Sequence, residues 1–139
     1  MNTLQIILLV LMTIIAITAP ICNAIMDTLK DHFDKSIFKD KTSWDPSDSW
    51  KNKWKNGDES QGEKYPGSSS IFSFLSDKWH LFKSICFNAY QINFVLFGLF
   101  CYQFDKIEWY YFLISFVIYK ALWMGIFHIF YTYILVKKK

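Results

Sequence analysis

Aspartate and histidine side chains recur at helical spacing beside the apolar stretches of this 139-residue chain. Asp77 and His80 are three residues apart, and Asp27 precedes Asp31 by four, so each pair shares one face of a helix. A carboxylate beside an imidazole could bind zinc or another divalent metal. It could equally transfer a proton, with the carboxylate orienting the ring. In the third interpretation, the two side chains only hydrogen-bond to each other or to water where a helix meets the lipid headgroups.

Three uncharged or nearly uncharged stretches must position these side chains. Residues 1–26 carry no charge, and the run from Ser84 to Tyr119 is interrupted only by charges around Lys106. A helix of roughly 20 apolar residues crosses the hydrocarbon core of a bilayer. The sequence therefore predicts an all-α integral membrane protein with a single N-terminal span and a C-terminal helical hairpin, its spans at residues 85–104 and 108–136.

The hairpin register predicts which side chains share a depth. Around a turn at Asp105 and Lys106, Lys120 falls level with Gln91 near the midplane, and His128 falls level with Lys83. That level is the boundary where Asp27 leaves the first span. Ionisable groups in a membrane are candidates for function.

One polar cluster at this boundary is therefore expected. Its members, which are the candidate catalytic residues and, with His32 as a peripheral member, the candidate ligands of a divalent metal, are Asp27, Asp77, His80 and His128. No HExxH motif, glycine-rich phosphate loop or Ser/His/Asp order is present, so no enzyme class is indicated.

The first span has two interpretations. Leu4 to Ala19 resembles the core of a signal peptide, and Cys22-Asn23-Ala24 ends in a residue that a signal peptidase accepts. No basic residue precedes the apolar run, however, and this favours a retained helix. The lysines that close the chain then place the C-terminus in the cytoplasm, the N-terminus outside and the segment from Asp27 to Lys83 inside.

The polar middle of the chain divides into several parts. Residues 24–38 have the pattern of an amphipathic helix that continues the first span. Asp45 and Pro46 are typical of the start of a short helix that would end near Gly57. Tryptophan beside lysine suits lipid headgroups, because an indole is apolar apart from one donor. The expected interface anchors are Trp44, Trp50, Trp54, Trp79 and Trp109.

Glycine, proline and serine between Asn56 and Ser70 indicate an exposed linker. Ser70 would then cap a helix over residues 71–82 that lies on the membrane or runs unbroken into the second span. The predicted organisation is therefore a first span over residues 1–26, an interfacial segment and linker over 27–70, and an interfacial helix, hairpin and basic tail over 71–139.

Composition narrows the function classes. With 53% hydrophobic residues, the chain has too little charge to cover a small soluble domain. The lysines of the middle segment alternate with acidic residues and form no basic stripe, so nucleic acid is not an expected partner. Cys22, Cys86 and Cys101 have no spacing typical of a zinc site or a disulfide framework.

Several short strings of the middle segment carry a resemblance to other proteins. They are Trp44-Asp45-Pro46, Ser49-Trp50-Lys51-Asn52-Lys53-Trp54, Gly57-Asp58, Gly67-Ser68 and Ser76-Asp77-Lys78-Trp79-His80-Leu81-Phe82. Residues 23–82 resemble a group of small, uncharacterised membrane proteins of bacteria and their phages. The resemblance implies that such proteins share this middle segment, and it carries no activity.

Three functions stay open at this point. The first is a non-enzymatic membrane subunit or adaptor, whose partners are the bilayer and other membrane helices or further copies of itself. The second is a metal-binding protein or enzyme at the membrane interface that uses the Asp/His cluster. The third follows from the layout of the spans, which matches that of one class of phage holins, small proteins that permeabilise membranes.

Overall fold

Three long helices carry the fold in the computed structural model, which describes residues 1–104 and 106–137. They are α1 (Thr3–Asp31), α3 (Lys78–Cys101) and α4 (Trp109–Ile129), and α4 continues as a π-helical turn, Phe130–Leu135. All three are long and apolar enough to cross a membrane, which confirms the all-helical class and the number of candidate spans. Asp105 of the predicted turn, and Lys138 and Lys139 of the basic tail, lie outside the described residues.

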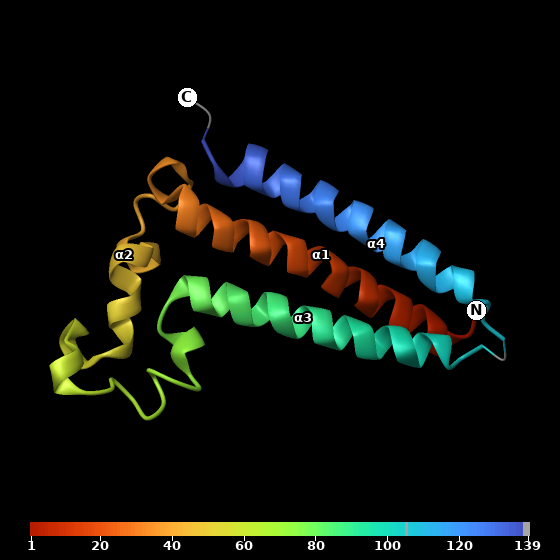
Figure 1. Cartoon of the computed structure of the whole chain (residues 1–139), viewed down its shortest axis with the longest axis horizontal. Helices are drawn as coiled ribbons and strands as arrows, with labels where there is room; N and C mark the ends of the chain where they lie inside the picture. Colours follow the sequence, from red (N-terminus) through yellow and green to blue (C-terminus); the bar gives the residue numbers. More distant parts are fainter. Residues whose placement is uncertain (105, 138–139) are drawn as a thin grey trace.

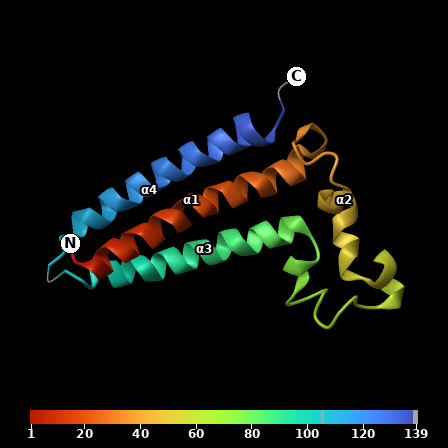
Figure 2. The same cartoon turned by 180° about the vertical axis from the view of Figure 1, so that it is seen from behind.

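Helix α1 lies between α3 and α4 and packs against both (Figures 1 and 2). It begins at a capping box, in which the Asn2 side chain accepts the backbone N–H of Gln5 and the Gln5 side chain accepts that of Asn2, each at 2.8 Å. The N-terminus and the α3–α4 turn lie at one end of the bundle (Figure 1). The polar residues between α1 and α3 lie at the other end.

Small side chains line the contact between α1 and α3. Ala19 and Cys22 of α1 pack against Cys86 and Ala89 of α3, and all four are buried. Small residues let two helix backbones approach closely, which is how helices associate where lipid and protein are equally apolar. The three cysteines are free thiols.

Helices α3 and α4 run antiparallel and meet through larger side chains. The rings of Phe97 and Phe112 lie edge to face at 5.7 Å between centroids, and Tyr119 lies beside Asn93. Both pairs follow the antiparallel register expected from the sequence. The two arms of the hairpin are nevertheless assembled around α1, an arrangement that the hairpin register did not predict.

The residues between α1 and α3, 32–77, form a small polar lobe (Figure 1). Its α-helical turn α2 (Pro46–Ser49) begins as predicted, because the Asp45 side chain accepts the backbone N–H of Ser47 at 2.9 Å. The other helical turns of the lobe are 3₁₀ turns at Phe33–Lys35, Thr42–Trp44, Trp50–Lys53, Lys55–Gly57, Glu59–Gln61 and Ser73–Leu75.

The lobe differs from the sequence expectation in four places. The short helix predicted to end near Gly57 ends at Ser49, and two 3₁₀ turns separated by the extended Trp54 follow it. Helix α1 ends at Asp31, so the predicted amphipathic helix is interrupted before Phe38. The expected linker is folded, because Ser68 is fully buried and its hydroxyl donates to the carbonyl oxygen of Lys53 at 2.6 Å. No helix runs unbroken from Ile71, because the Asp77 side chain caps a new helix that begins at Lys78.

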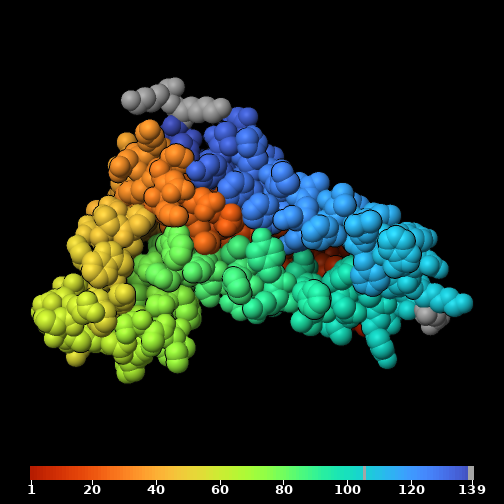
Figure 3. Space-filling model, viewed as in Figure 1, coloured from red at the N-terminus to blue at the C-terminus, as the bar shows by residue number. Residues whose placement is uncertain are grey.

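The lobe, the end of α1 and the end of α4 share a second apolar core. Its buried members are Ala24, Leu29, Phe38 and Leu135. Two backbone hydrogen bonds fasten this junction: the Ile37 N–H donates to the Leu135 carbonyl at 2.9 Å, and the Lys137 N–H donates to the Lys35 carbonyl at 2.8 Å. In the space-filling view the segment after α1 lies against the last residues of α4 (Figure 3). Phe82 of α3 also packs against this core, so the lobe contacts all three helices.

Candidate functional site

Asp77 and His80 form the closest pair of titratable side chains among the predicted site residues. One Asp77 carboxylate oxygen accepts the backbone N–H of His80 at 2.8 Å, and the other lies 2.5 Å from the His80 Nδ1. Asp77 is buried at 7% exposure, while the His80 side chain is 43% exposed. The spacing of three residues produces this pair because a residue that caps a helix faces the third residue of its first turn.

The cap explains why the pair lies where it does. The first backbone N–H groups of any helix have no partner within the helix, and an aspartate at the preceding position accepts one of them. The negative charge also lies at the positive end of the helix dipole. Asp77 therefore fixes the start of α3, and the same carboxylate orients the His80 ring. Chemically, this pair can hold a proton between a carboxylate and an imidazole.

The other predicted members have separate partners. Asp27 accepts a hydrogen bond of 3.4 Å from the Asn23 side chain, one turn earlier on α1. His32 caps the end of α1, and its ring lies 5.5 Å from that of Tyr131. His128 is exposed, and its Nδ1 lies 3.2 Å from the Thr132 hydroxyl.

Within residues 1–104 and 106–137, no group of three or more His, Cys, Asp or Glu side chains is arranged to hold a metal ion. The structure thus brings together Asp77 and His80 but does not add Asp27, His32 or His128 to them. The predicted four-residue cluster reduces to one carboxylate–imidazole pair.

The expected tryptophan anchors lie in different environments. Trp44 is part of the second core, stacked on Phe38 at 4.6 Å and packed against Phe82 at 5.7 Å. Trp44 was predicted as an interface anchor from its neighbours in the sequence. Packing against residues distant in the sequence places it in the core instead. Trp109 is 73% exposed at the start of α4, and that helix begins at the end of the bundle opposite the lobe (Figure 1).

Lysine ammonium groups lie over the rings of Trp50, Trp54 and Trp79, and Lys41 and Lys78 also lie over that of Trp44. Lys53 is 5.7 Å from the Trp50 ring and 5.4 Å from the Trp54 ring, and Lys83 is 4.9 Å from the Trp79 ring. These are distances at which a cation and an aromatic ring attract each other. Trp50 and Trp54 therefore share one lysine.

Glu63 is a structural residue that is not among those predicted from the sequence. Its carboxylate accepts the backbone N–H groups of Gly67 at 2.9 Å and Ser69 at 3.0 Å, and it also accepts the Ser69 hydroxyl. These hydrogen bonds, that of the Ser69 hydroxyl first, hold the pKa of Glu63 below its ordinary value. The sequence feature that could have pointed to Glu63 is the Pro66-Gly67 turn beside it, where Gly67 has a positive φ of 79°.

Asp58 has a comparable role at the neighbouring turn. Its carboxylate accepts the Ser60 hydroxyl at 2.8 Å and the Ser60 backbone N–H at 2.9 Å. Hydrogen bonds from the Ser60 side chain and backbone, followed by one from the Gln61 side chain, lower the pKa of Asp58.

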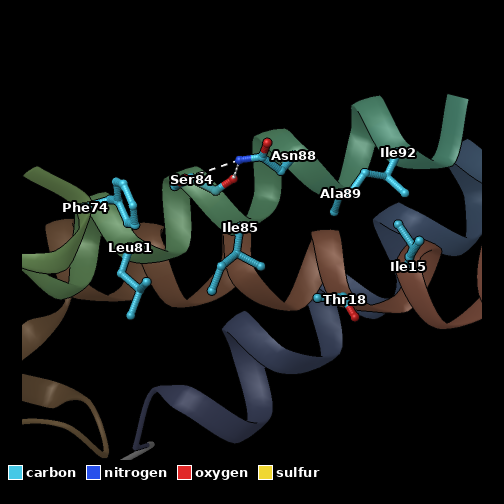
Figure 4. Close-up of a pocket in the computed structure, with 9 residues that line it drawn as sticks. All are labelled: Ile15, Thr18, Phe74, Leu81, Ser84, Ile85, Asn88, Ala89 and Ile92. Carbon is cyan, nitrogen blue, oxygen red and sulfur yellow. Dashed lines mark hydrogen bonds between the residues drawn. The ribbon is translucent and has the colours of Figure 1, made fainter. Parts of the chain in front are cut away.

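A shallow groove of about 350 Å³ runs between α1 and α3 (Figure 4). It is lined by Ile15, Thr18, Phe74, Leu81, Ser84, Ile85, Asn88, Ala89 and Ile92. The Asn88 amide donates to the Ser84 carbonyl at 2.8 Å, and the Thr18 hydroxyl donates to the Ile14 carbonyl at 2.8 Å. Its polar groups are therefore satisfied along their own helices, and the groove offers a mainly apolar surface.

Lys120 is the only charged residue of α4. It is exposed, and its ammonium lies 5.7 Å from the Trp123 ring. The hairpin register indicated the depth of Lys120, but Lys120 is not among the site residues predicted from the sequence.

Comparison of the chain with protein-family models, curated proteins and solved structures finds no match.

Proposed function

We propose that this chain is a three-pass integral membrane protein that acts as a non-enzymatic subunit or adaptor. The observation that carries the proposal is the separation of surfaces along the bundle. Large apolar side chains cover the outside of the three helices, while the charges of the described chain gather mainly in the lobe at one end. Contiguous apolar surface on this scale requires lipid or other helices to cover it.

Helix α4 shows the exposed apolar surface most clearly. None of its residues is buried, and Phe116 and Met124 are exposed at 60% and 62%. A surface helix of a water-soluble protein keeps a polar face toward solvent, whereas a helix that is apolar all round is covered by protein or lipid. The apolar surface of α4 supports burial in a bilayer.

Helix α1 is retained in this proposal. It lies between α3 and α4, and its Ala19, Ala24 and Leu29 are fully buried against the rest of the chain. Cleavage after Ala24 would remove the central helix of the bundle. The central position of α1 therefore supports a retained span.

The proposed orientation places the N-terminus and the α3–α4 turn outside, and the lobe and the C-terminus in the cytoplasm. It is supported by the lysines of the lobe and the chain end, since basic flanks stay in the cytoplasm. The Trp/Lys contacts of the lobe would lie at the headgroups of that leaflet.

Cysteine labelling tests this proposal. The native cysteines are replaced by alanine, and single cysteines are introduced as Ser43→Cys in the lobe, Lys106→Cys at the turn, and Phe116→Cys on the apolar face of α4. An impermeant maleimide on intact cells should label only Lys106→Cys, and permeabilised cells should add Ser43→Cys. Phe116→Cys is the matched control, because it is exposed in the protein but would lie in lipid.

Two results would contradict the proposal in different ways. Rapid labelling of Phe116→Cys would place α4 in water and end the membrane-spanning assignment. Labelling of Ser43→Cys but not of Lys106→Cys on intact cells would keep the spans and reverse the orientation.

A further inference from the structure

We propose that the face of α4 around Lys120 binds another membrane helix that carries an aspartate or glutamate side chain at the middle of the bilayer. The inference rests on the proposed function, because only a membrane-spanning α4 places Lys120 in hydrocarbon. Beyond the proposed function, it specifies the kind of partner and the side-chain contact that would select this partner.

Lys120 lies near the centre of its span. At a rise of about 1.5 Å per residue, about 16 Å of helix separates it from Trp109 and about 22 Å from Leu135. The hydrocarbon core is about 30 Å thick, so both headgroup regions lie far from its Cα. Lysines reach the headgroups from positions near helix ends, and a lysine at midspan is costly and marks a functional contact.

No carboxylate of the described chain is placed to pair with Lys120. The ion pairs formed by residues 1–104 and 106–137 are those of Asp48 with Lys51 and of Asp77 with His80. The acidic residues next to the spans lie at helix ends: Asp27 and Asp31 on α1, Asp77 before α3, and Glu108 before α4. The Lys120 ammonium lies instead over the Trp123 ring.

The surroundings of Lys120 suit a helix as the occupant. Residues three and four positions apart lie side by side on a helix, and Val117 and Met124 flank Lys120 in this way. They are 58% and 62% exposed, and Leu113, one turn before Val117, is 56% exposed. Lys120 is thus a single positive charge in an outward apolar stripe. A membrane helix with a carboxylate at the same depth complements both the apolar stripe and the charge.

A second copy of this chain fits that face poorly. Two α4 helices packed through the same stripe would bring their Lys120 ammonium groups together at the same depth, and like charges in a desolvated contact repel. The described helices also offer no midspan carboxylate to such a copy. The charge on this face therefore favours a different protein as the partner.

The test uses the full chain in phosphatidylcholine vesicles, with a donor fluorophore on Lys106→Cys in the protein whose native cysteines are alanine. The probe is a synthetic polyleucine helix that carries one aspartate at its centre and an acceptor fluorophore. Matched probes carry asparagine or leucine at that position. Energy transfer should show the aspartate helix associating roughly tenfold more tightly than the leucine helix. Lys120→Met should remove this preference, and Lys120→Arg should keep it.

Three results would overturn the inference. The aspartate and leucine helices could associate equally, or Lys120→Met could leave the preference for aspartate unchanged. Mixed donor- and acceptor-labelled copies of the chain could also associate with each other through Lys120, which would make a second copy the occupant.

Maleimide labelling of Lys106→Cys and Lys137→Cys in the same vesicles separates this inference from the proposed function. Labelling from one side only would refute the span, whereas opposite sides without an aspartate preference would refute the inference alone.

Discussion

The backbone N–H of Lys137 donates to the carbonyl oxygen of Lys35 at 2.8 Å and so joins the end of α4 to the segment that follows α1. Its companion bond runs from the Ile37 N–H to the Leu135 carbonyl. The lobe is therefore attached to the bundle by backbone pairing as well as by apolar packing.

Lys137→Pro should loosen this attachment, because proline has no N–H to donate. The loss of one backbone hydrogen bond is expected to cost about 1 kcal/mol locally. Hydrogen exchange of the Ile37 amide measures this local loss of stability. Lys137→Ala is the control, because it keeps the N–H. Equal protection of the Ile37 amide in both variants would show that this pairing is not maintained in solution.

Asp77→Ala should lower the stability of the protein by about 1 kcal/mol, because the start of α3 would lose its cap. Asp77→Ser should retain most of that stability, since a serine hydroxyl can accept the same backbone N–H. The measurement is denaturant unfolding of the detergent-solubilised protein, followed by tryptophan fluorescence. If the serine variant is as unstable as the alanine variant, the contact with the His80 ring matters more than the cap.

Leu29→Ala should destabilise the protein by about 2–5 kcal/mol, because Leu29 is fully buried where the lobe, α1 and α4 meet. The control is Ile14→Ala on the same helix, where the side chain is 56% exposed and no cavity forms. Unfolding of both variants under identical detergent conditions gives the comparison. Similar losses at the two positions would show that the second core is not formed.

The lobe should lose stability in acid through Glu63. Its pKa in the folded lobe lies below the ordinary value of 4.5, so the unfolded chain takes up the proton at a higher pH than the folded one. The stabilisation is complete above pH 4.5 and is lost as the pH falls through the lowered pKa. Glu63→Gln should weaken the lobe at neutral pH and reduce this acid step.

Tryptophan fluorescence against pH, read in a variant that retains only Trp50, follows the acid loss. Asp58→Asn is the matched control, since Asp58 also has a lowered pKa at a separate turn. An acid transition that is unchanged in Glu63→Gln would assign it to other carboxylates.

Trp50 and Trp123 should lie at different depths in a bilayer. Variants that retain a single tryptophan are placed in vesicles whose lipids are brominated either near the headgroup or deep in the acyl chain. Shallow bromine should quench Trp50, which lies in the lobe and is 43% exposed, and deep bromine should quench Trp123 near the middle of α4. Complete quenching of Trp50 by aqueous iodide, with no effect of brominated lipid, would remove the lobe from the headgroups.

Local chemistry explains which features could be predicted from the sequence. Continuous apolar runs specify three long helices, because a helix satisfies its own backbone wherever it lies. Asp45 followed by Pro46 specified the start of α2 through a cap and a fixed φ. The spacing of Asp77 and His80 brought them together for the same local reason, although their place at the start of α3, rather than within a longer helix, was missed.

The tertiary structure decided the features that depend on residues distant in sequence. Trp44 enters the core because Phe38 and Phe82 enclose it from two other segments, and Ser68 is buried because the backbone at Lys53 offers it an acceptor. The close contact of α1 with α3 likewise follows from small side chains on both helices at once. His32 and His128 share the predicted depth range but have different neighbours, since depth along a helix does not specify the direction in which a side chain points.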